Sequence, residues 1–216
     1  MPLWSRPVRL KFRTQIDLGF VISGIILAAG LSSRMGQPKA LLDWGGEPLV
    51  CYQVAQMREA GCDEIIVVLG HKADDVSRQM RTTQCRTMLN PRYQHGRAGS
   101  LRIGAKAANR DADAILISDI DSPRPASFLK ALIEGHRPEC AVTRPVHNGH
   151  RGHPIVVSGR LREELMQASD EAEGLHGVLR AHANEAGEVD AGDLLDLGFN
   201  TREEYEAARE RFGLGR

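Results

Sequence analysis

Apolar runs alternate with amphipathic segments along the chain, and this pattern predicts its elements. Runs rich in isoleucine, valine and leucine indicate buried strands, and the segments between them have a helical period. Strands are predicted over residues 21–29, 63–70, 86–90, 113–121, 140–146, 154–159 and, weakly, 193–197. Helices are predicted over residues 47–61, 72–81, 100–109 and 124–136, with two more after the strand at 154–159 and a last one from Thr201. The alternation predicts a single-domain α/β fold with a doubly wound, Rossmann-like, mostly parallel (mixed) sheet and helices on both faces.

Local signals mark two helices and one edge of the predicted sheet. Pro48 and Gly61 are typical residues for the two ends of the helix at 47–61. Thr201 and Glu204 are spaced as a capping box. Ligands of doubly wound sheets bind beyond the carboxyl ends of the strands. In this chain a glycine-rich loop (30–36) and an acidic segment (119–121) fall at that edge.

The composition excludes several classes of function. A chain of 216 residues is long enough for one sizeable domain. Lysine plus arginine equals aspartate plus glutamate, so broad electrostatic capture of nucleic acid or an anionic membrane is not expected, and local donors must hold any bound anion. The four cysteines lie far apart without a C-x-x-C pair, which suits a reducing cytosol and predicts a cytoplasmic protein.

The N-terminal region has two interpretations. "RPVRLKFR" followed by "LGFVISGIILAAG" resembles the basic and apolar regions of a secretion signal. Asp17 stands at the start of the apolar stretch, and cleavage after it would remove the strand that the loop needs. We therefore expect residues 1–20 to be an extension outside the fold, which could be disordered, and residues 21–216 to form the domain.

The loop after the first strand contains Gly30, Gly36 and two cations, Arg34 and Lys39. Its spacing fits neither a Walker A loop nor the dinucleotide fingerprint G-x-G-x-x-G. The backbone N–H groups of such a wide loop can wrap an anion, with Arg34 and Lys39 aimed into it. An ordinary β–α turn with two solvated cations is the alternative, and spacing alone leaves both open.

Several motifs carry a resemblance to a known family. "LAAGLSSRMGQPKALLDWGGEPLV" resembles the signature loop of nucleotidyltransferases with a glycosyltransferase-A-like fold, most of all the molybdenum cofactor cytidylyltransferases and their molybdopterin-guanine-dinucleotide relatives. "NPRYQHGRAGSLRIGA", "DSP", "RGHPIVVS" and "FNTREEYE" resemble further segments of that family and follow in its order. The chain departs from the pattern at Ser122, at His176, at Arg202 and at Gly198 and Phe199, which look inserted. These departures concern the acceptor substrate more than the nucleotide chemistry.

The resemblance implies transfer of a nucleoside monophosphate, CMP from CTP, onto a phosphate-bearing acceptor such as molybdopterin, with release of pyrophosphate. Arg34, Lys39 and Asp121 would be the catalytic residues, His153 would lie on the acceptor side, and Mg²⁺ or Mn²⁺ would be the cofactor. A molybdoenzyme or its chaperone could be a further partner. The nucleotide-binding residues implied are Leu27, Ala28, Ala29, Gly30, Arg34, Gly36, Lys39, Gly96, Gly99 and Ser100.

The metal ligands are predicted from the acids at the end of one strand. Asp119 and Asp121 alternate along that strand, so both could face one ion, and Asp121 matches the metal motif of the family. An acid that caps the following helix is a second interpretation, which fits Ser122 better than Asp121. Asn200 is either a further ligand or a helix cap, a role that Thr201 could equally perform.

The histidines, the acceptor and the question of turnover each allow a second interpretation. His147, His150 and His153 could hold a transition metal, although a loop on the acceptor side is the better interpretation. The acceptor could be another phosphate, such as a sugar phosphate, or the enzyme could transfer GMP to molybdopterin. A nucleotide-binding maturation protein without turnover is a third hypothesis.

Overall fold

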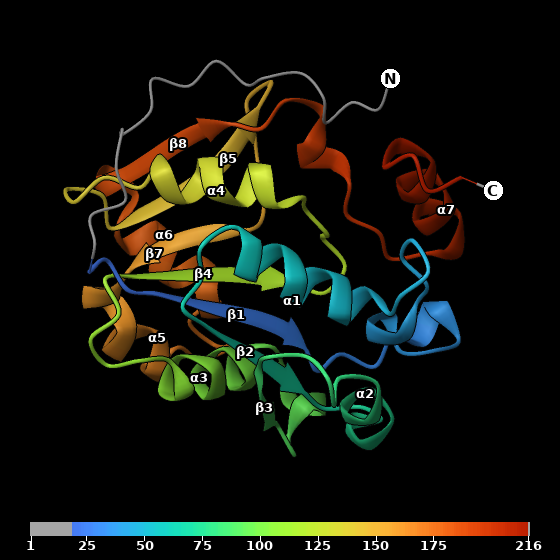
Figure 1. Cartoon of the computed structure of the whole chain (residues 1–216). Coiled ribbons are helices and arrows are strands. Elements are labelled where there is room, and N and C mark those ends of the chain that lie inside the picture. The colour runs from blue at the N-terminus through green and yellow to red at the C-terminus, as the bar shows by residue number, and fades with distance from the viewer. Residues whose placement is uncertain (1–18, 216) are drawn as a thin grey trace.

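The computed structural model describes residues 19–215, and they form one α/β domain around an eight-stranded sheet (Figure 1). The strand order is β3-β2-β1-β4-β7-β5-β6, with β8 paired to β5. Strand β7 runs antiparallel to β4 and β5, and β6 runs antiparallel to β5, whereas the other pairs are parallel. The predicted mixed, mostly parallel sheet is confirmed. The expected N-terminal extension lies outside the described residues except at Gly19 and Phe20.

The strands and helices alternate as the hydrophobic pattern predicts. The strands are β1 (Ile22–Ala28), β2 (Glu64–Leu69), β3 (Arg86–Leu89), β4 (Ala114–Asp119), β5 (Val142–His147), β6 (His150–Arg151), β7 (Ile155–Ser158) and β8 (Ala186–Asp190). The α-helices are α1 (Leu49–Glu59), α2 (Ala73–Gln79), α3 (Ala98–Ala107), α4 (Ala126–Glu134), α5 (Arg162–Gln167), α6 (Gly174–Ala181) and α7 (Arg202–Arg211). Strand β1 lies between β2 and β4, so the apolar stretch in question at the N-terminus belongs to the centre of the sheet.

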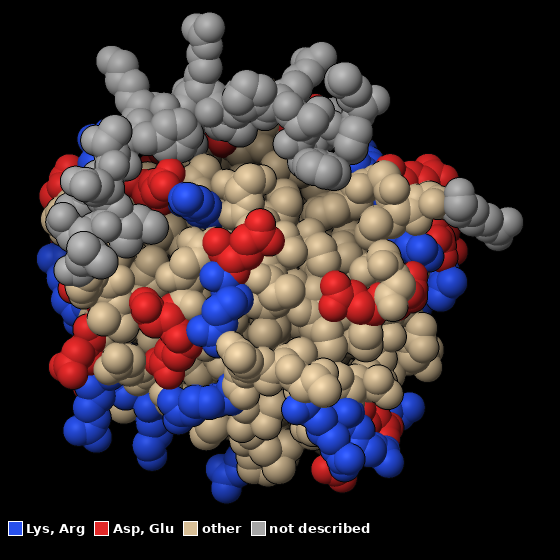
Figure 2. All heavy atoms as spheres, viewed as in Figure 1, with Lys and Arg blue, Asp and Glu red and all other residues tan. Residues whose placement is uncertain are grey.

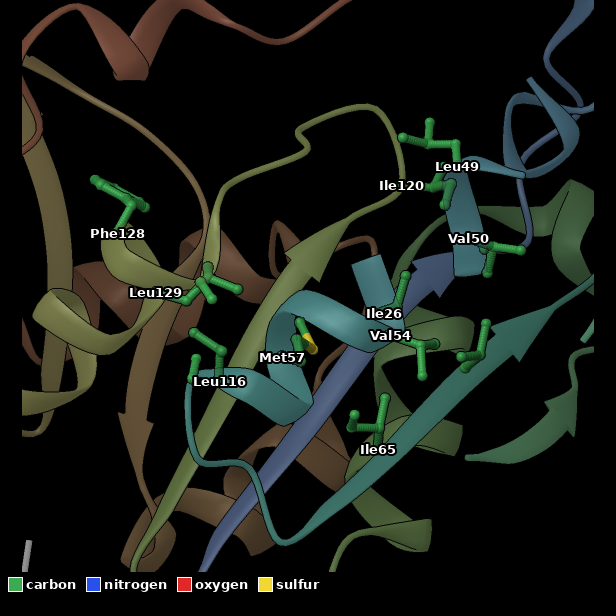
Figure 3. Close-up of a cluster of buried hydrophobic side chains, with 14 of the residues drawn as sticks. Ile26, Leu49, Val50, Val54, Met57, Ile65, Leu116, Ile120, Phe128 and Leu129 are labelled. Atoms are coloured by element: carbon green, nitrogen blue, oxygen red, sulfur yellow. The ribbon is translucent and has the colours of Figure 1, made fainter. Parts of the chain in front are cut away.

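Helices cover both faces of the sheet. Helices α1 and α4 pack on one face, seen in front in Figure 1, and α3, α5 and α6 pack on the other. In the cluster of Figure 3, Val54 and Met57 of α1 reach down to Ile26 and Leu116 of the central strands. All four side chains are buried, and each apolar side chain removed from water contributes about 1.5–3 kcal/mol to stability. The parallel pairing of β1 with β4 places their carboxyl ends beside each other.

The C-terminal helix α7 attaches through an aromatic cluster. The Trp44 ring stacks on Phe199 with centroids 6.0 Å apart and meets Phe212 edge-on at 5.0 Å. The Tyr205 hydroxyl donates a hydrogen bond of 2.5 Å to the Asp43 carbonyl. Thr201 begins the helix with the predicted capping box, since its side chain accepts from the Glu204 N–H. Because of this attachment, residues 199–200 lie against the loop that follows β1.

One local prediction and one alternative interpretation are wrong. Residues 193–197 do not form a strand, because residues 192–196 form a 3₁₀ helix, and the last strand is β8, whose hydrogen bonds come from β5 some 44 residues away. Only Val189 of β8 is buried, so the sequence carries no clear strand signal there. Ser122 does not cap α4, because that helix begins at Ala126, whose N–H donates to Gln56 Oε1 at 2.8 Å.

The face that α1 and α4 cover carries charges of both signs. Figure 2 shows Lys and Arg interspersed with Asp and Glu across it, which matches the zero net charge. Across residues 19–215, no helix is long and apolar enough to cross a membrane.

Candidate active site

A pocket with a cavity volume of about 310 Å³ opens at the carboxyl ends of β1 and β4. Parallel strands meet there, so the glycine-rich loop and the acidic segment come together as predicted. The predicted site residues that line this pocket are Leu27, Ala29, Gly30, Arg34, Lys39, Gly96, Ser100, Asp119, Asp121 and Asn200.

Four further predicted site residues lie outside the pocket lining. Ala28 is buried at the end of β1, and Gly36 lies exposed at the end of the glycine-rich loop with a φ of 69°. Gly99 lines a neighbouring hollow, where a Cβ would stand 3.3 Å from the Asn90 amide nitrogen. His153 lies beside Asp119.

The glycine-rich loop folds on itself before it reaches Lys39. Ser32 has a left-handed backbone (φ 52°), and its carbonyl accepts from the Met35 N–H at 2.9 Å. Its hydroxyl accepts from the Lys39 N–H at 3.1 Å. Arg34 stands on the exposed side of this loop, so its guanidinium is available to a ligand, whereas the Lys39 side chain turns inward.

The Lys39 ammonium is the centre of the site. Its Nζ donates to Asp121 Oδ2 at 2.7 Å, to the Phe199 carbonyl at 2.9 Å and to Asn200 Oδ1 at 3.0 Å. The residue is only 8% exposed, so these contacts replace water around a buried charge. Lys39 therefore connects the loop after β1, the acidic segment after β4 and the segment before α7.

Asp119 lies against a different cation. It forms an ion pair with Arg97, and this carboxylate is the largest cause of the raised pKa of Arg97. Helix α1 fixes the acidic segment from behind, since Gln53 Nε2 donates to the Ile120 carbonyl at 2.8 Å. The two acids line one pocket, but each is neutralised by its own cation.

Ala29 and Ser100 also line the pocket. Ala29 is buried, and its carbonyl accepts from the His71 N–H at 3.2 Å. A Cβ on Gly70 would stand 2.6 Å from that carbonyl, so glycine is required at this close approach. Ser100 is held by the buried Asn90, whose Nδ2 donates to the serine hydroxyl at 2.9 Å. Ala29 thus adds an apolar side chain to the pocket lining and Ser100 adds a hydroxyl, beside Tyr93 and Arg97.

Asp170 fixes the loop between Asn90 and Ser100. Its Oδ1 accepts from the N–H groups of Arg97 at 2.9 Å and Ala98 at 3.1 Å, at the start of α3. A Cβ on Gly96 would clash with the Asp170 carboxylate, so the acid packs directly on the loop backbone. The carboxylate thus satisfies helix N–H groups and sets the position of two residues that line the pocket.

His153 stands on the far side of Asp119. Its Nδ1 is 3.9 Å from Asp119 Oδ2, and its ring meets His176 edge-on with centroids 6.2 Å apart. Burial lowers the pKa of His153, and nearby Asp119 partly opposes this effect. The imidazole is therefore neutral near pH 7 and can accept a hydrogen bond from a ligand.

The remaining histidines of "HNGHRGH" face elsewhere. His147 pairs with His150 across the β5–β6 hairpin, and its ring nitrogens lie 3.3 Å from Asp190 and 3.6 Å from Asp193. Within residues 19–215, no group of three or more His, Cys, Asp or Glu side chains could hold a metal ion. A divalent cation at this site would instead be held by a few protein oxygens together with water or phosphate oxygens. Asp121 and Asn200 offer such oxygens, which suit Mg²⁺ or Mn²⁺.

Several residues of the site were not predicted from the sequence. Tyr93 and Arg97 line the pocket, and Asp170 and the Phe199 carbonyl position its walls. Arg97 had a signal, since it is a cation inside the "HGRAGS" segment. The Phe199 carbonyl had none, because every residue has one.

The fold and this site define a nucleotidyltransferase: a doubly wound sheet with a cationic glycine-rich loop and an acidic segment at one pocket. The family model described as "MobA-like NTP transferase domain" matches residues 24–186, and the chain belongs to that family.

Curated relatives cover most of the chain. A molybdenum cofactor cytidylyltransferase from Escherichia coli is 28% identical over 88% of this chain and 97% of its own. A probable molybdenum cofactor guanylyltransferase from Bacillus mycoides is 28% identical over 87% and 96%. A nicotine blue oxidoreductase from Paenarthrobacter nicotinovorans is 29% identical over 74% and 81%.

Solved structures share the fold. A nucleotidyl transferase from Methanothermobacter superposes with a TM-score of 0.77 at 25% identity, over 91% of this chain and 99% of its own. The Mycobacterium tuberculosis protein Rv0371c, solved with manganese, superposes with a TM-score of 0.73 at 22% identity, over 88% and 98%.

Proposed function

We propose that this protein transfers CMP from CTP onto a phosphate group of molybdopterin and releases pyrophosphate. The observation that carries the proposal is one pocket that joins Arg34 of the glycine-rich loop, the Lys39–Asp121 pair and the buried Ala29. The acceptor is favoured by the cytidylyltransferase relative, which aligns over nearly its whole length. The nucleotide is favoured by the Ala29 methyl, which narrows the space beside the base.

The chemistry needs alignment and charge neutralisation more than proton transfer. An oxygen of the acceptor phosphate attacks the α-phosphorus of the triphosphate. The bond from that phosphorus to the oxygen of the β-phosphate breaks, and pyrophosphate leaves with the electron pair. The attacking oxygen is already anionic, so no strong base is required. Arg34 and backbone N–H groups of residues 30–36 other than that of Met35, which donates to Ser32, would hold the triphosphate. His153 would face the acceptor.

A divalent cation, Mg²⁺ or Mn²⁺, belongs to the proposal. When bound, it neutralises negative charge on the phosphate oxygens. Asp121 and Asn200 would hold it, with Asp119 as the second choice among the acids. The oxygens offered by these residues fit the preference of both cations for hard ligands.

Pyrophosphate release tests the proposal. We would compare all four nucleoside triphosphates, with and without purified molybdopterin, on the wild type and on Lys39→Ala, with the exposed Lys130→Ala as the control. CTP with molybdopterin should give the highest rate, and Lys39→Ala should raise the barrier by about 2–4 kcal/mol. A higher rate with GTP, or with a sugar phosphate as acceptor, would replace the assigned substrates. The proposal would be wrong if no triphosphate released pyrophosphate with any acceptor.

A further inference from the structure

The Lys39 ammonium fills a position that also suits a metal ion. An ammonium group has three N–H donors, and here three oxygens lie 2.7, 2.9 and 3.0 Å from the nitrogen. They come from a carboxylate (Asp121), a backbone carbonyl (Phe199) and a side-chain amide (Asn200). With all its donors engaged, Lys39 has none left for a phosphate oxygen in this arrangement.

The same oxygens are of the type that hard divalent cations prefer. Carboxylate, amide and carbonyl oxygens are ligands of Mg²⁺ and Mn²⁺, which lie roughly 2.0–2.2 Å from them. A divalent ion bound to these oxygens would occupy much of the space that the ammonium now fills. Two cations at such a separation repel strongly, so both cannot stay there together.

We propose that the Lys39 ammonium and a divalent cation are alternative occupants of this three-oxygen site, with the Phe199 carbonyl as its third oxygen. The inference rests on the proposed function, because the triphosphate must receive the ammonium that the metal displaces. Without nucleotide, Lys39 neutralises Asp121 and weakens metal binding. With the triphosphate present, the ammonium gains phosphate oxygens, so metal and nucleotide bind cooperatively.

The Phe199 carbonyl is held rigidly enough for this role. The Phe199 ring is fully buried and stacks on Trp44, with an angle of 21° between the rings. The Phe199 N–H donates to the Asp121 carbonyl at 3.1 Å, so the backbone of Phe199 is held as well as its ring. Phe199 belongs to the pair of residues that look inserted relative to the family pattern. Its carbonyl lies beside the two predicted ligands, since Lys39 Nζ donates to it at 2.9 Å and to both of them as well.

Mn²⁺ binding without nucleotide tests the exchange, with the signal of free Mn²⁺ in electron paramagnetic resonance as the readout. Lys39→Met removes the competing cation at similar length and should bind Mn²⁺ about ten-fold more tightly than the wild type. The exposed Lys130→Met is the control and should not change the affinity. Unchanged or weaker binding by Lys39→Met would overturn the proposal and leave Lys39 as a positioning residue for Asp121 and Asn200.

A double variant locates the metal. Lys39→Met with Asp121→Asn should lose the gain in affinity, whereas a gain that persists would place the metal elsewhere and overturn the proposal. Thermal unfolding of each variant checks that it is folded. If Lys39→Met does not fold, the wild type is titrated with Mg²⁺ and the NMR signal of the Lys39 ¹³Cε is followed. That signal is identified by its absence in Lys39→Arg. That signal should shift, and a signal that stays unchanged at saturation would overturn the exchange.

A last comparison separates this inference from the proposed function. Mn²⁺ binding is measured with CTP present, on the wild type and on Asp121→Asn. Binding that depends on Asp121, together with no gain for Lys39→Met, would overturn the exchange alone. Binding with CTP that does not depend on Asp121 would overturn both the exchange and the metal ligands of the proposed function.

Discussion

The carboxylates of Asp119 and Asp121 lie two residues apart in the chain but contact different cations. Asp121 pairs with the buried Lys39, 2.7 Å away, whereas Asp119 pairs with Arg97, whose side chain is 75% exposed. Asp121 thus shares the Lys39 ammonium with Asn200. Asp119 lies next to His153, whose Nδ1 is 3.9 Å from its Oδ2. This arrangement gives the two acids unequal roles.

Asp121→Ala should reduce metal-dependent turnover more than Asp119→Ala. Among the residues described, Asp121 is the only carboxylate that accepts from the same cation, Lys39, as Asn200. Its loss should lower metal-dependent turnover by about 10²-fold or more. Steady-state pyrophosphate release over a Mg²⁺ titration measures this effect, with the exposed Asp111→Ala as the control. The reverse order of the two variants would show that the metal motif has been placed two residues away from its true position.

Ala29→Gly should weaken the preference for CTP over GTP. The methyl of Ala29 is buried in the pocket wall, and its loss would widen the space that the proposed function assigns to the base. A methyl contact of this kind is worth about 1–3 kcal/mol, so a ten-fold shift in the ratio of kcat/KM is expected. Ala28→Gly is the matched control, because Ala28 is buried next to it but does not line the pocket. A wild type that prefers GTP would contradict the cytidylyl assignment.

Asp170→Ala should raise the KM for the triphosphate more than it lowers kcat. The carboxylate accepts from two N–H groups at the start of α3, and loss of such a cap destabilises a helix by about 0.5–2 kcal/mol. Gly96 and Arg97 would then be less well positioned at the pocket. Steady-state kinetics, with the neighbouring exposed Glu171→Ala as the control, measures the effect. Equal kinetics for the two variants would show that Asp170 does not position this loop.

His136 should make stability depend on pH between about 4 and 6.5. Burial, and to a smaller extent Arg160, lowers the pKa of His136 from its ordinary value of 6.5 to about 4. The unfolded chain therefore binds a proton in this range that the folded chain does not, so stability is complete above pH 6.5 and falls as the pH drops toward 4. The loss from this group is about 3 kcal/mol, from the size of the shift.

Urea unfolding of the wild type and of His136→Asn over this pH range checks that prediction. The difference in unfolding free energy between the two proteins should shrink as the pH falls, since the variant has no imidazole to protonate. Asparagine can still hydrogen-bond to Thr143, whose hydroxyl lies 2.8 Å from His136 Nδ1. A difference that stays constant from pH 7 to 4 would contradict the lowered pKa.

Features that depend on residues close together in the chain could be predicted from the amino-acid sequence alone. The apolar periods indicated the strands β1, β2 and β4 and the helices between them, because burial on one or two faces requires those periods. Thr201 and Glu204 are three residues apart, so their capping box could be recognised directly. The loop from Gly30 to Lys39 and the acid Asp121 could be placed at one edge, because parallel strands end together there.

Which groups meet at the site depends on the folded chain as a whole. Lys39 contacts residues 82 and 161 positions away, and no local pattern shows that its ammonium faces Asp121 and Asn200 instead of the loop. Strand β8 exists because β5 supplies its hydrogen bonds, and its own sequence is too polar to signal a strand. These outcomes depend on packing between distant segments: the burial of Phe199 against Trp44 sets where its carbonyl lies, and that carbonyl sets the position of Lys39.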